Sequence, residues 1–215
     1  VVEKDGKFYY YTTVQAGEPY TGKAVGVAVG NSPTGPFVDA IGAPLVHDKM
    51  TDNGERGRWN DIDPTVLIDG EEAWLCWGNG TCFLAKLKSN MIELDGEIKV
   101  LDLPKYVEGP WLHKHNGLYY LTYAGMGEGR ENIAYATATS MEGPWTYQGE
   151  LTGMAENSFT IHPGIIDYQG QWYLFYHNAV LTLNGIQGTI GRRSVCVDKL
   201  YYNEDGTMKY VEQTR

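Results

Sequence analysis

Basic residues are scarce in this sequence. Its 215 residues include 17 Lys and Arg against 27 Asp and Glu, which gives a formal net charge of −10 at pH 7. Proteins that bind nucleic acids or anionic membranes need clusters of positive charge. The composition therefore excludes nucleic acid and membrane as expected partners and favours a small neutral ligand.

Cysteines and long apolar segments are also scarce. The three cysteines, Cys76, Cys82 and Cys196, follow no zinc-binding spacing. We expect free buried thiols, and a disulfide between Cys76 and Cys82 is the alternative. No apolar run approaches the roughly 18 residues that a membrane-spanning helix needs. Nothing in the sequence indicates a cellular compartment.

Glycines and tyrosines are abundant. The chain contains 27 Gly and 16 Tyr, a composition typical of β-strands and tight turns, and it shows no convincing amphipathic helix. A short apolar run, a tight glycine turn and an aromatic run recur four times, roughly 50 residues apart. The four segments are VVEKDGKFYYYT, PTVLIDGEEAWLCWG, GPWLHKHNGLYYLTYA and PGIIDYQGQWYLFYH, with turn glycines Gly6, Gly70, Gly117 and Gly170.

A second element repeats as well. AVGVAVGNSPTGPFVDAIG resembles NIAYATATSMEGPWTYQGE, so each unit consists of a hairpin, a third strand ending in S-x-x-G-P-[FW], and an outer strand. Four antiparallel strands in about 50 residues make one propeller blade. We therefore predict an all-β fold, a β-propeller in which residues 1–215 form a single domain. A β-sandwich is the alternative.

Three ionisable residues precede the first strands of three of these units. Asp63 and His162 are each followed directly by proline, and Glu108 is followed by Gly109-Pro110. Proline suits the first position of a strand. In a propeller the first strand of each blade lies along the central channel, so we expect the three side chains to converge at one end of it.

Two carboxylates in a pocket with aromatic walls are typical of glycoside hydrolysis. One carboxyl group must be protonated to donate to the leaving oxygen, so its pKa has to be raised by apolar surroundings or by a like charge nearby. Glu108 has apolar sequence neighbours, and Asp63 can supply the neighbouring negative charge. Trp74 and Trp111 are candidates for stacking on a sugar ring.

These motifs resemble glycoside hydrolase family 43, whose members are five-bladed propellers that act on arabinose and xylose glycosides. The resemblance covers nearly the whole chain and is carried by IDPTVLIDGEEAWLCWG, VEGPWLHKHNGLYYLTYA, IHPGIIDYQGQWYLFYHN and GRRSVCVDKLYYNEDGT. It implies an inverting β-xylosidase or α-L-arabinofuranosidase of plant hemicellulose. Glu108 matches the general acid, and Asp63 matches the aspartate that raises the pKa of the acid.

The resemblance also implies a metal site and a sugar-binding arginine. His162 matches a channel histidine that contacts an ion, often calcium, through water, and no organic cofactor is expected. Arg193 matches an arginine that holds sugar hydroxyl groups, although the strand register decides between Arg192 and Arg193. His113 and His115, near a hairpin tip, are expected on a solvated face rather than in a metal site.

The sequence departs from the family pattern at its start. An inverting enzyme needs a further carboxylate as general base, and the family places it at the start of the first blade. VVEKDGKFYYYT resembles the second blade, so blades two to five are expected here, in an N-terminally truncated propeller without the base. Among the nearby acids Asp48, Asp52 and Asp61, Asp61 is the candidate substitute.

A propeller without its first blade leaves two blade faces uncovered. Large uncovered apolar faces normally mark interfaces, and unpaired strand edges favour pairing. We therefore expect either self-association or a complementing N-terminal blade. A sugar-binding or structural piece without turnover is the alternative to a glycosidase.

Overall fold

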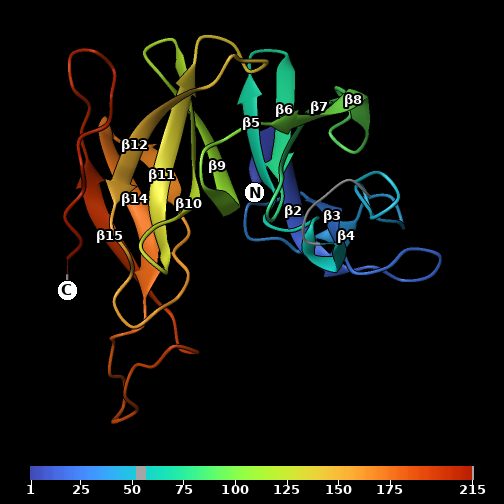
Figure 1. Cartoon of the computed structure of the whole chain (residues 1–215). Coiled ribbons are helices and arrows are strands. Elements are labelled where there is room, and N and C mark those ends of the chain that lie inside the picture. The colour runs from blue at the N-terminus through green and yellow to red at the C-terminus, as the bar shows by residue number, and fades with distance from the viewer. Residues whose placement is uncertain (52–56, 215) are drawn as a thin grey trace. The chain divides into compact units, whose positions relative to one another are not determined.

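The computed structural model describes residues 1–51 and 57–214, and antiparallel strands make up almost all of its regular structure (Figure 1). Within these residues the only helix is the short 3-10 helix η1 (Gly57–Trp59). No helix in the described part of the chain is long and apolar enough to cross a membrane. The strands are β1 (Val2–Lys4), β2 (Lys7–Gln15), β3 (Lys23–Gly30), β4 (Val38–Asp39), β5 (Thr65–Asp69), β6 (Glu72–Trp77), β7 (Cys82–Leu87), β8 (Leu94–Leu101), β9 (Tyr106–His115), β10 (Leu118–Met126), β11 (Glu131–Ala138), β12 (Thr146–Thr152), β13 (Gly164–Tyr168), β14 (Gln171–Asn178) and β15 (Ser194–Leu200).

Strands that follow one another in sequence pair with one another and form four antiparallel sheets. Their strand orders are β1-β2-β3-β4, β5-β6-β7-β8, β12-β11-β10-β9 and β13-β14-β15. Each sheet contains one of the four repeated hairpins, as the sequence predicted. The alternating segment NIAYATA lies within strand β11.

The contacts divide the chain into two compact units. The first contains Val1–Asp102 together with Glu108–Pro110, and the second contains Leu103–Val107 together with Trp111–Arg215. Strand β9 therefore contributes residues to both units. The expectation that residues 1–215 form a single domain stays a prediction.

The hairpin turns explain why the repeats are recognisable in sequence. Both residues of the turns Asp5-Gly6, Asn116-Gly117 and Gln169-Gly170 have positive φ, with Asn116 at 47° and Gly117 at 81°. Two-residue turns of this kind match the right-handed twist of the paired strands, and they require residues that tolerate positive φ. The glycines of these motifs are therefore needed by the backbone.

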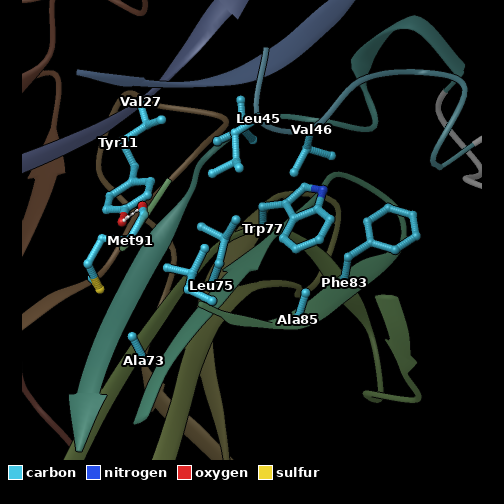
Figure 2. Close-up of a cluster of buried hydrophobic side chains, with 12 residues drawn as sticks. Tyr11, Val27, Leu45, Val46, Ala73, Leu75, Trp77, Phe83, Ala85 and Met91 are labelled. Atoms are coloured by element: carbon cyan, nitrogen blue, oxygen red, sulfur yellow. Dashed lines mark hydrogen bonds between the residues drawn. The ribbon is translucent and has the colours of Figure 1, made fainter. Parts of the chain in front are cut away.

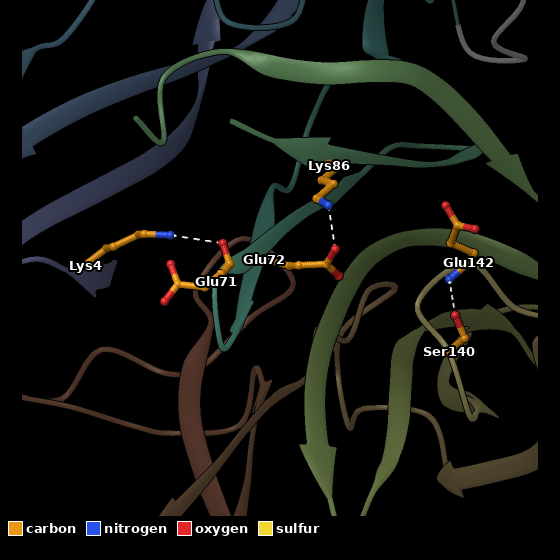
Figure 3. A network of polar contacts seen from close by, with 6 residues as sticks. All are labelled: Lys4, Glu71, Glu72, Lys86, Ser140 and Glu142. Atoms are coloured by element: carbon orange, nitrogen blue, oxygen red, sulfur yellow. Dashed lines mark hydrogen bonds and ion pairs between the residues drawn. The ribbon is translucent and has the colours of Figure 1, made fainter. Parts of the chain in front are cut away.

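The S-x-x-G-P turns have the same hydrogen bonds in two different sheets. The backbone N–H of Gly35 donates to the carbonyl oxygen of Ser32 at 3.0 Å, and that of Gly143 donates to the carbonyl oxygen of Ser140 at 2.9 Å. In the second turn the N–H of Glu142 also donates to the Ser140 hydroxyl at 3.3 Å (Figure 3). The second repeated element is thus confirmed at the level of backbone geometry.

The first unit has an aromatic core. Trp77 and Phe83, both fully buried, stack with ring centroids 5.5 Å apart, and the hydroxyl of Tyr11 donates to the carbonyl oxygen of Met91 at 2.6 Å (Figure 2). Aromatic side chains contribute the largest buried areas in a core, and a buried tyrosine hydroxyl needs such an acceptor. The core therefore joins β2 to the segment after β7.

Cys76 and Cys82 lie in the same unit and are free thiols, as expected. Their sulfur atoms are 3.5 Å apart, and burial raises the pKa of the Cys76 thiol. Buried neutral thiols of this kind behave as small apolar groups.

Lysine side chains make exposed contacts with the β5–β6 hairpin. Lys86 forms an ion pair with Glu72, and the ammonium group of Lys4 donates to the carbonyl oxygen of Glu71 at 3.3 Å (Figure 3). The side chains of Lys86 and Glu72 are 34% and 52% exposed. Exposed pairs of this type contribute little to stability, so the buried core holds the hairpin.

The second unit buries a histidine that the sequence placed on a solvated face. His113 is 5% exposed, stacks on Tyr120 at 4.7 Å between ring centroids, and shares a 2.9 Å hydrogen bond between Nε2 and the Tyr202 hydroxyl. The hydroxyl of Tyr120 in turn donates to the carbonyl oxygen of Gly206 at 2.6 Å. The expectation for His113 was wrong because the segment after β15 returns to cover this hairpin.

We predict that the stability of the protein falls between pH 6.5 and pH 3 because of His113. Burial, helped by repulsion from His115, lowers the pKa of His113 from 6.5 to about 3. In this interval His113 binds a proton in the unfolded chain but not in the folded chain. Neutral His113 therefore contributes its full stability above pH 6.5, and this stability is lost as the pH falls. The free energy of unfolding should decrease by about 1.4 kcal/mol for each pH unit.

Urea unfolding at pH 7 and pH 5 measures this slope. His113→Gln should have a shallower dependence of unfolding free energy on pH than the wild-type chain, whereas the control His47→Gln should keep it. An unchanged slope in His113→Gln would contradict the assignment.

Candidate active site

Asp63 occupies an unusual backbone conformation just before strand β5. Its φ is 57°, a region that non-glycine residues seldom adopt and that aspartate tolerates better than most. Its backbone N–H donates to the Thr13 hydroxyl of strand β2 at 3.0 Å. Strained residues of this kind persist where the surrounding structure holds them, and they are concentrated at functional sites.

The segment leading to Asp63 is fixed by the buried carboxylate of Asp61. Asp61 is 1% exposed and accepts hydrogen bonds from the Thr51 hydroxyl, at 2.7 and 2.8 Å to its two oxygens, and from Trp77 Nε1 at 3.0 Å. Burial raises the pKa of Asp61, while the Thr51 and Trp77 hydrogen bonds oppose the shift. The backbone N–H of Gly78 also donates to the carbonyl oxygen of Ile62 at 2.9 Å.

Glu108 lies near the start of strand β9. It is half-buried, with buried Val107 before it in the chain and buried Gly109 and Pro110 after it. Its Oε2 accepts a 2.8 Å hydrogen bond from the Nδ2 of Asn79, in the turn between β6 and β7. Glu108 therefore has a fixed orientation, with an amide donor directed at one carboxylate oxygen.

Asn79 is a site residue that the sequence did not reveal. Its backbone N–H donates to the carbonyl oxygen of Asn60 at 3.2 Å, which places it beside the Asp61 segment. The preceding Gly78 has φ 131°, and a Cβ there would lie 2.0 Å from the carbonyl oxygen of Thr81. In sequence, an asparagine between two glycines is ordinary turn chemistry, so only the fold identifies it.

Asp63 and Glu108 are brought together, as the sequence predicted. One carboxylate oxygen of Asp63 lies within 4.8 Å of one of Glu108, and both residues are half-buried. An acid and a base that share a water across a sugar ring are separated by about 6.5–9.5 Å. The pair is therefore too close for Asp63 to be such a base, and close enough for its charge to act on Glu108.

His162 lies in the second unit, just before strand β13, and is half-buried. Its ring centroid is 5.9 Å from that of His177, whose Nε2 lies 3.2 Å from the Thr160 hydroxyl. The expectation that His162 contacts an ion through water stays a prediction.

The two adjacent arginines have different surroundings. Arg192 donates from Nη1 to the carbonyl oxygen of Gln187 at 2.8 Å and from its backbone N–H to the carbonyl oxygen of Thr189. Arg193 is exposed, immediately before β15, and its side chain makes no hydrogen bond or ion pair among the described residues. Arg192 thus holds its own loop, whereas the Arg193 side chain is available, and its sugar-binding role stays a prediction.

The predicted aromatic platforms are largely used for packing. Trp111 is half-buried and donates from Nε1 to the carbonyl oxygen of Ile165 at 2.9 Å. Trp74 is 5% exposed, and the ammonium group of Lys86 lies 6.0 Å from its ring centroid. Both roles in sugar binding stay predictions, and burial leaves Trp74 little surface for stacking.

The candidate substitutes for a general base are engaged elsewhere. Asp48 accepts hydrogen bonds from Thr21, at 3.2 Å from the backbone N–H and at 2.7 Å from the hydroxyl. These bonds lower the pKa of Asp48, with the hydroxyl contributing most. Asp61 is buried among its donors, and Asp52 lies outside the described residues.

The motifs and the paired carboxylates agree with a comparison of the sequence with protein families. Residues 1–208 match the family described as Glycosyl hydrolases family 43. The chain belongs to glycoside hydrolase family 43. It is 28% identical to a xylosidase/arabinosidase of Bacteroides ovatus and 30% identical to a β-D-galactofuranosidase of Aspergillus niger, in both cases over 99% of its own length. It spans 72% of the first relative and 61% of the second.

Solved family-43 structures show the same fold. An α-L-arabinofuranosidase of Clostridium thermocellum matches 99% of this chain and 71% of its own, with 30% identity and a TM-score of 0.79. A β-xylosidase/α-arabinofuranosidase from a compost metagenome, in a calcium-free form with xylotriose, matches 98% and 71%, with 25% identity and a TM-score of 0.79. The predicted fold class is confirmed: this family-43 chain is an all-β propeller of the five-bladed type, and its four sheets are four blades.

Proposed function

We propose that this family-43 chain is a glycosidase domain acting on xylose or arabinose glycosides of plant hemicellulose, with inversion of configuration. The observation that carries the proposal is the half-buried Asp63–Glu108 pair, with carboxylate oxygens within 4.8 Å. Two like charges at this distance favour the protonated form of one of them. Glu108 is the general acid and Asp63 keeps it protonated.

The chemistry assigned to Glu108 is proton donation to the glycosidic oxygen. As the bond between the anomeric carbon and that oxygen breaks, the Glu108 proton passes to the leaving group and the carboxylate remains. The amide N–H₂ of Asn79, 2.8 Å from Oε2, stabilises the carboxylate that forms. Arg193, Trp111 and Trp74 are the proposed sugar contacts, and Trp74 offers little surface because it is 5% exposed.

Water must be activated by a base on the opposite face of the sugar. Asp48 and Asp61 are unsuitable, because the carboxylate of each is held by neighbouring donors. We therefore assign the base to neither of them. This observation also favours a second candidate function, a sugar-binding piece without turnover.

We predict that, with a complementing blade that supplies the general base, Glu108→Gln lowers hydrolysis of xylosides with poor leaving groups by about 10²–10⁴-fold, because only proton donation is lost. Activated aryl xylosides and aryl arabinofuranosides should be affected much less, because their leaving groups need little protonation.

Asp63→Asn should move the alkaline limb of the pH–rate profile to lower pH, since it removes the charge that keeps Glu108 protonated. Initial rates across pH measure both effects.

Glu71→Gln, at the exposed β5–β6 turn, is the matched control and should retain the wild-type rate. An unchanged profile in Asp63→Asn would remove Asp63 from this role. Release of the retained anomer, observed by NMR, would make Asp63 a nucleophile instead. If the wild-type chain binds xylose but hydrolyses neither aryl substrate, the sugar-binding function is the correct one.

We further propose a structural Ca²⁺ ion that contacts His162 through water. Calcium prefers oxygen ligands, so a single half-buried imidazole fits an outer position better than a direct ligand. A related enzyme described in a calcium-free form supports a calcium site in the family. When bound, the ion supplies positive charge beside His162.

The predicted effect of calcium is a higher melting temperature. At a free concentration of about 100 times the dissociation constant, a ligand adds about 2.7 kcal/mol of stability. Differential scanning calorimetry with Ca²⁺, and after chelation, measures the shift, which should be smaller in His162→Ala than in the control His47→Ala. Equal melting temperatures with calcium and with chelator would contradict the ion.

An uncovered sheet face supports the expected association. On the β13–β15 sheet, Phe175 and Val197 are cross-strand neighbours and are 40% and 47% exposed. Val195 on the same strand is 79% exposed and Ile166 is 51% exposed, while the alternate residues face the core. An apolar face of this kind normally packs against another protein surface.

We predict that the chain associates through this face, with a second copy or with a complementing blade. Light scattering over a range of protein concentrations should show association that Val197→Asp reduces. Val100→Asp, at a 60% exposed position of strand β8, is the control and should leave it unchanged. A monomer at every concentration, with no blade bound, would contradict the prediction.

A further inference from the structure

A polar hollow in the second unit is lined by none of the residues that were assigned roles above. Its volume is about 440 Å³, within the range of roughly 300–1,000 Å³ that is usual for small-molecule sites. Three segments line it: Arg130 just before β11, residues 157–159 before β13, and residues 187–190 in the long loop between β14 and β15, drawn in orange in Figure 1.

The first two segments are held by backbone hydrogen bonds. The carbonyl oxygen of Phe159 accepts from the N–H of Glu131 at 3.1 Å, and Arg130 donates from Nη1 to the carbonyl oxygen of Ala155 at 3.4 Å. The side chain of Phe159 is nevertheless 63% exposed. An exposed aromatic ring on a fixed backbone is a ready platform for an apolar ring face.

The loop between β14 and β15 is held just as closely. Gly188 lies against the preceding strand end, so that a Cβ there would be 2.5 Å from the carbonyl oxygen of Ala179. Arg192 closes the same loop through its hydrogen bonds to the carbonyl oxygens of Gln187 and Thr189. The hollow is thus formed by ordered segments.

The lining has the chemistry of a carbohydrate site. Asn157 and Gln187 offer amide donors and acceptors, Thr189 offers a hydroxyl, and Arg130 offers a planar set of donors. Phe159 offers an aromatic face beside them. Sugars combine vicinal hydroxyl groups with an apolar C–H face, so they match both parts of this lining. An anion matches it less well, because a single arginine is the only positive charge in the lining.

We propose that this hollow is a second binding subsite for a neutral xylo-oligosaccharide, in addition to the site that contains Asp63 and Glu108. The choice of a pentose chain rests on the proposed function, and the hollow itself rests on its own residues. Phe159 stacks on one sugar ring, while Arg130 and Gln187 bind its hydroxyl groups.

The test is a titration of ¹⁵N-labelled Glu108→Gln protein with xylotriose, because this background prevents turnover. The amide signals of Asn157 and Gly188 should shift saturably. Phe159→Ala should weaken this binding about ten-fold, equivalent to about 1.4 kcal/mol. Tyr147→Ala, which removes a 39% exposed aromatic on β12, should leave it unchanged.

A pair of glycine variants tests the loop without removing any side chain. Gly188→Ala must displace the loop and weaken binding, whereas Gly191→Ala meets nothing within 4 Å and should bind like its parent. No shift at Asn157 and Gly188 with millimolar xylotriose would overturn the subsite, as would shifts produced by glucuronate or sulfate alone. Failure of the proposed function gives a different result: aryl glycosides are not hydrolysed, while the shifts of the Asn157 and Gly188 amide signals remain.

Discussion

The buried carboxylate of Asp61 is the constraint on which the placement of the Asp63–Glu108 pair depends. A carboxylate that is 1% exposed must be compensated by hydrogen bonds, and Thr51 and Trp77 provide them. Because Trp77 also stacks on Phe83 in the core, the bond ties the segment before β5 to the best-packed part of the first unit. Asp63, two residues further on, therefore follows a fixed segment, which helps to hold it in its positive-φ conformation.

The proposed general acid is positioned by different contacts. Glu108 stands in strand β9, whose residues 108–110 belong to the first unit by their contacts while the residues on either side belong to the second. Its orientation comes from Asn79, and Asn79 is placed by the tight turn at Gly78. The proposed subsite is built in a similar way. Its polar side chains lie on connecting segments, which are held by backbone hydrogen bonds and by one closely packed glycine.

Several properties of this protein could be predicted from sequence because they are local. The pairs Asp5-Gly6 and Asn116-Gly117 require positive φ, so they mark hairpins wherever they stand between apolar runs. Asp63 and Glu108 were recognisable because each precedes or opens the first strand of a repeated unit. Equivalent positions in repeated units are brought into equivalent places by the fold.

The sequence by itself therefore determined the blade repeats, the all-β class and the pairing of Asp63 with Glu108. Only the tertiary structure decided the partners of those residues. Asn79 reaches Glu108 across 29 residues, and Tyr202 reaches the buried His113 across 89. The same holds for Arg192, whose side chain faces its loop, and for Trp74, which packs below Lys86. Local patterns record backbone geometry, whereas burial and hydrogen-bond partners are set by contacts between segments far apart in the chain.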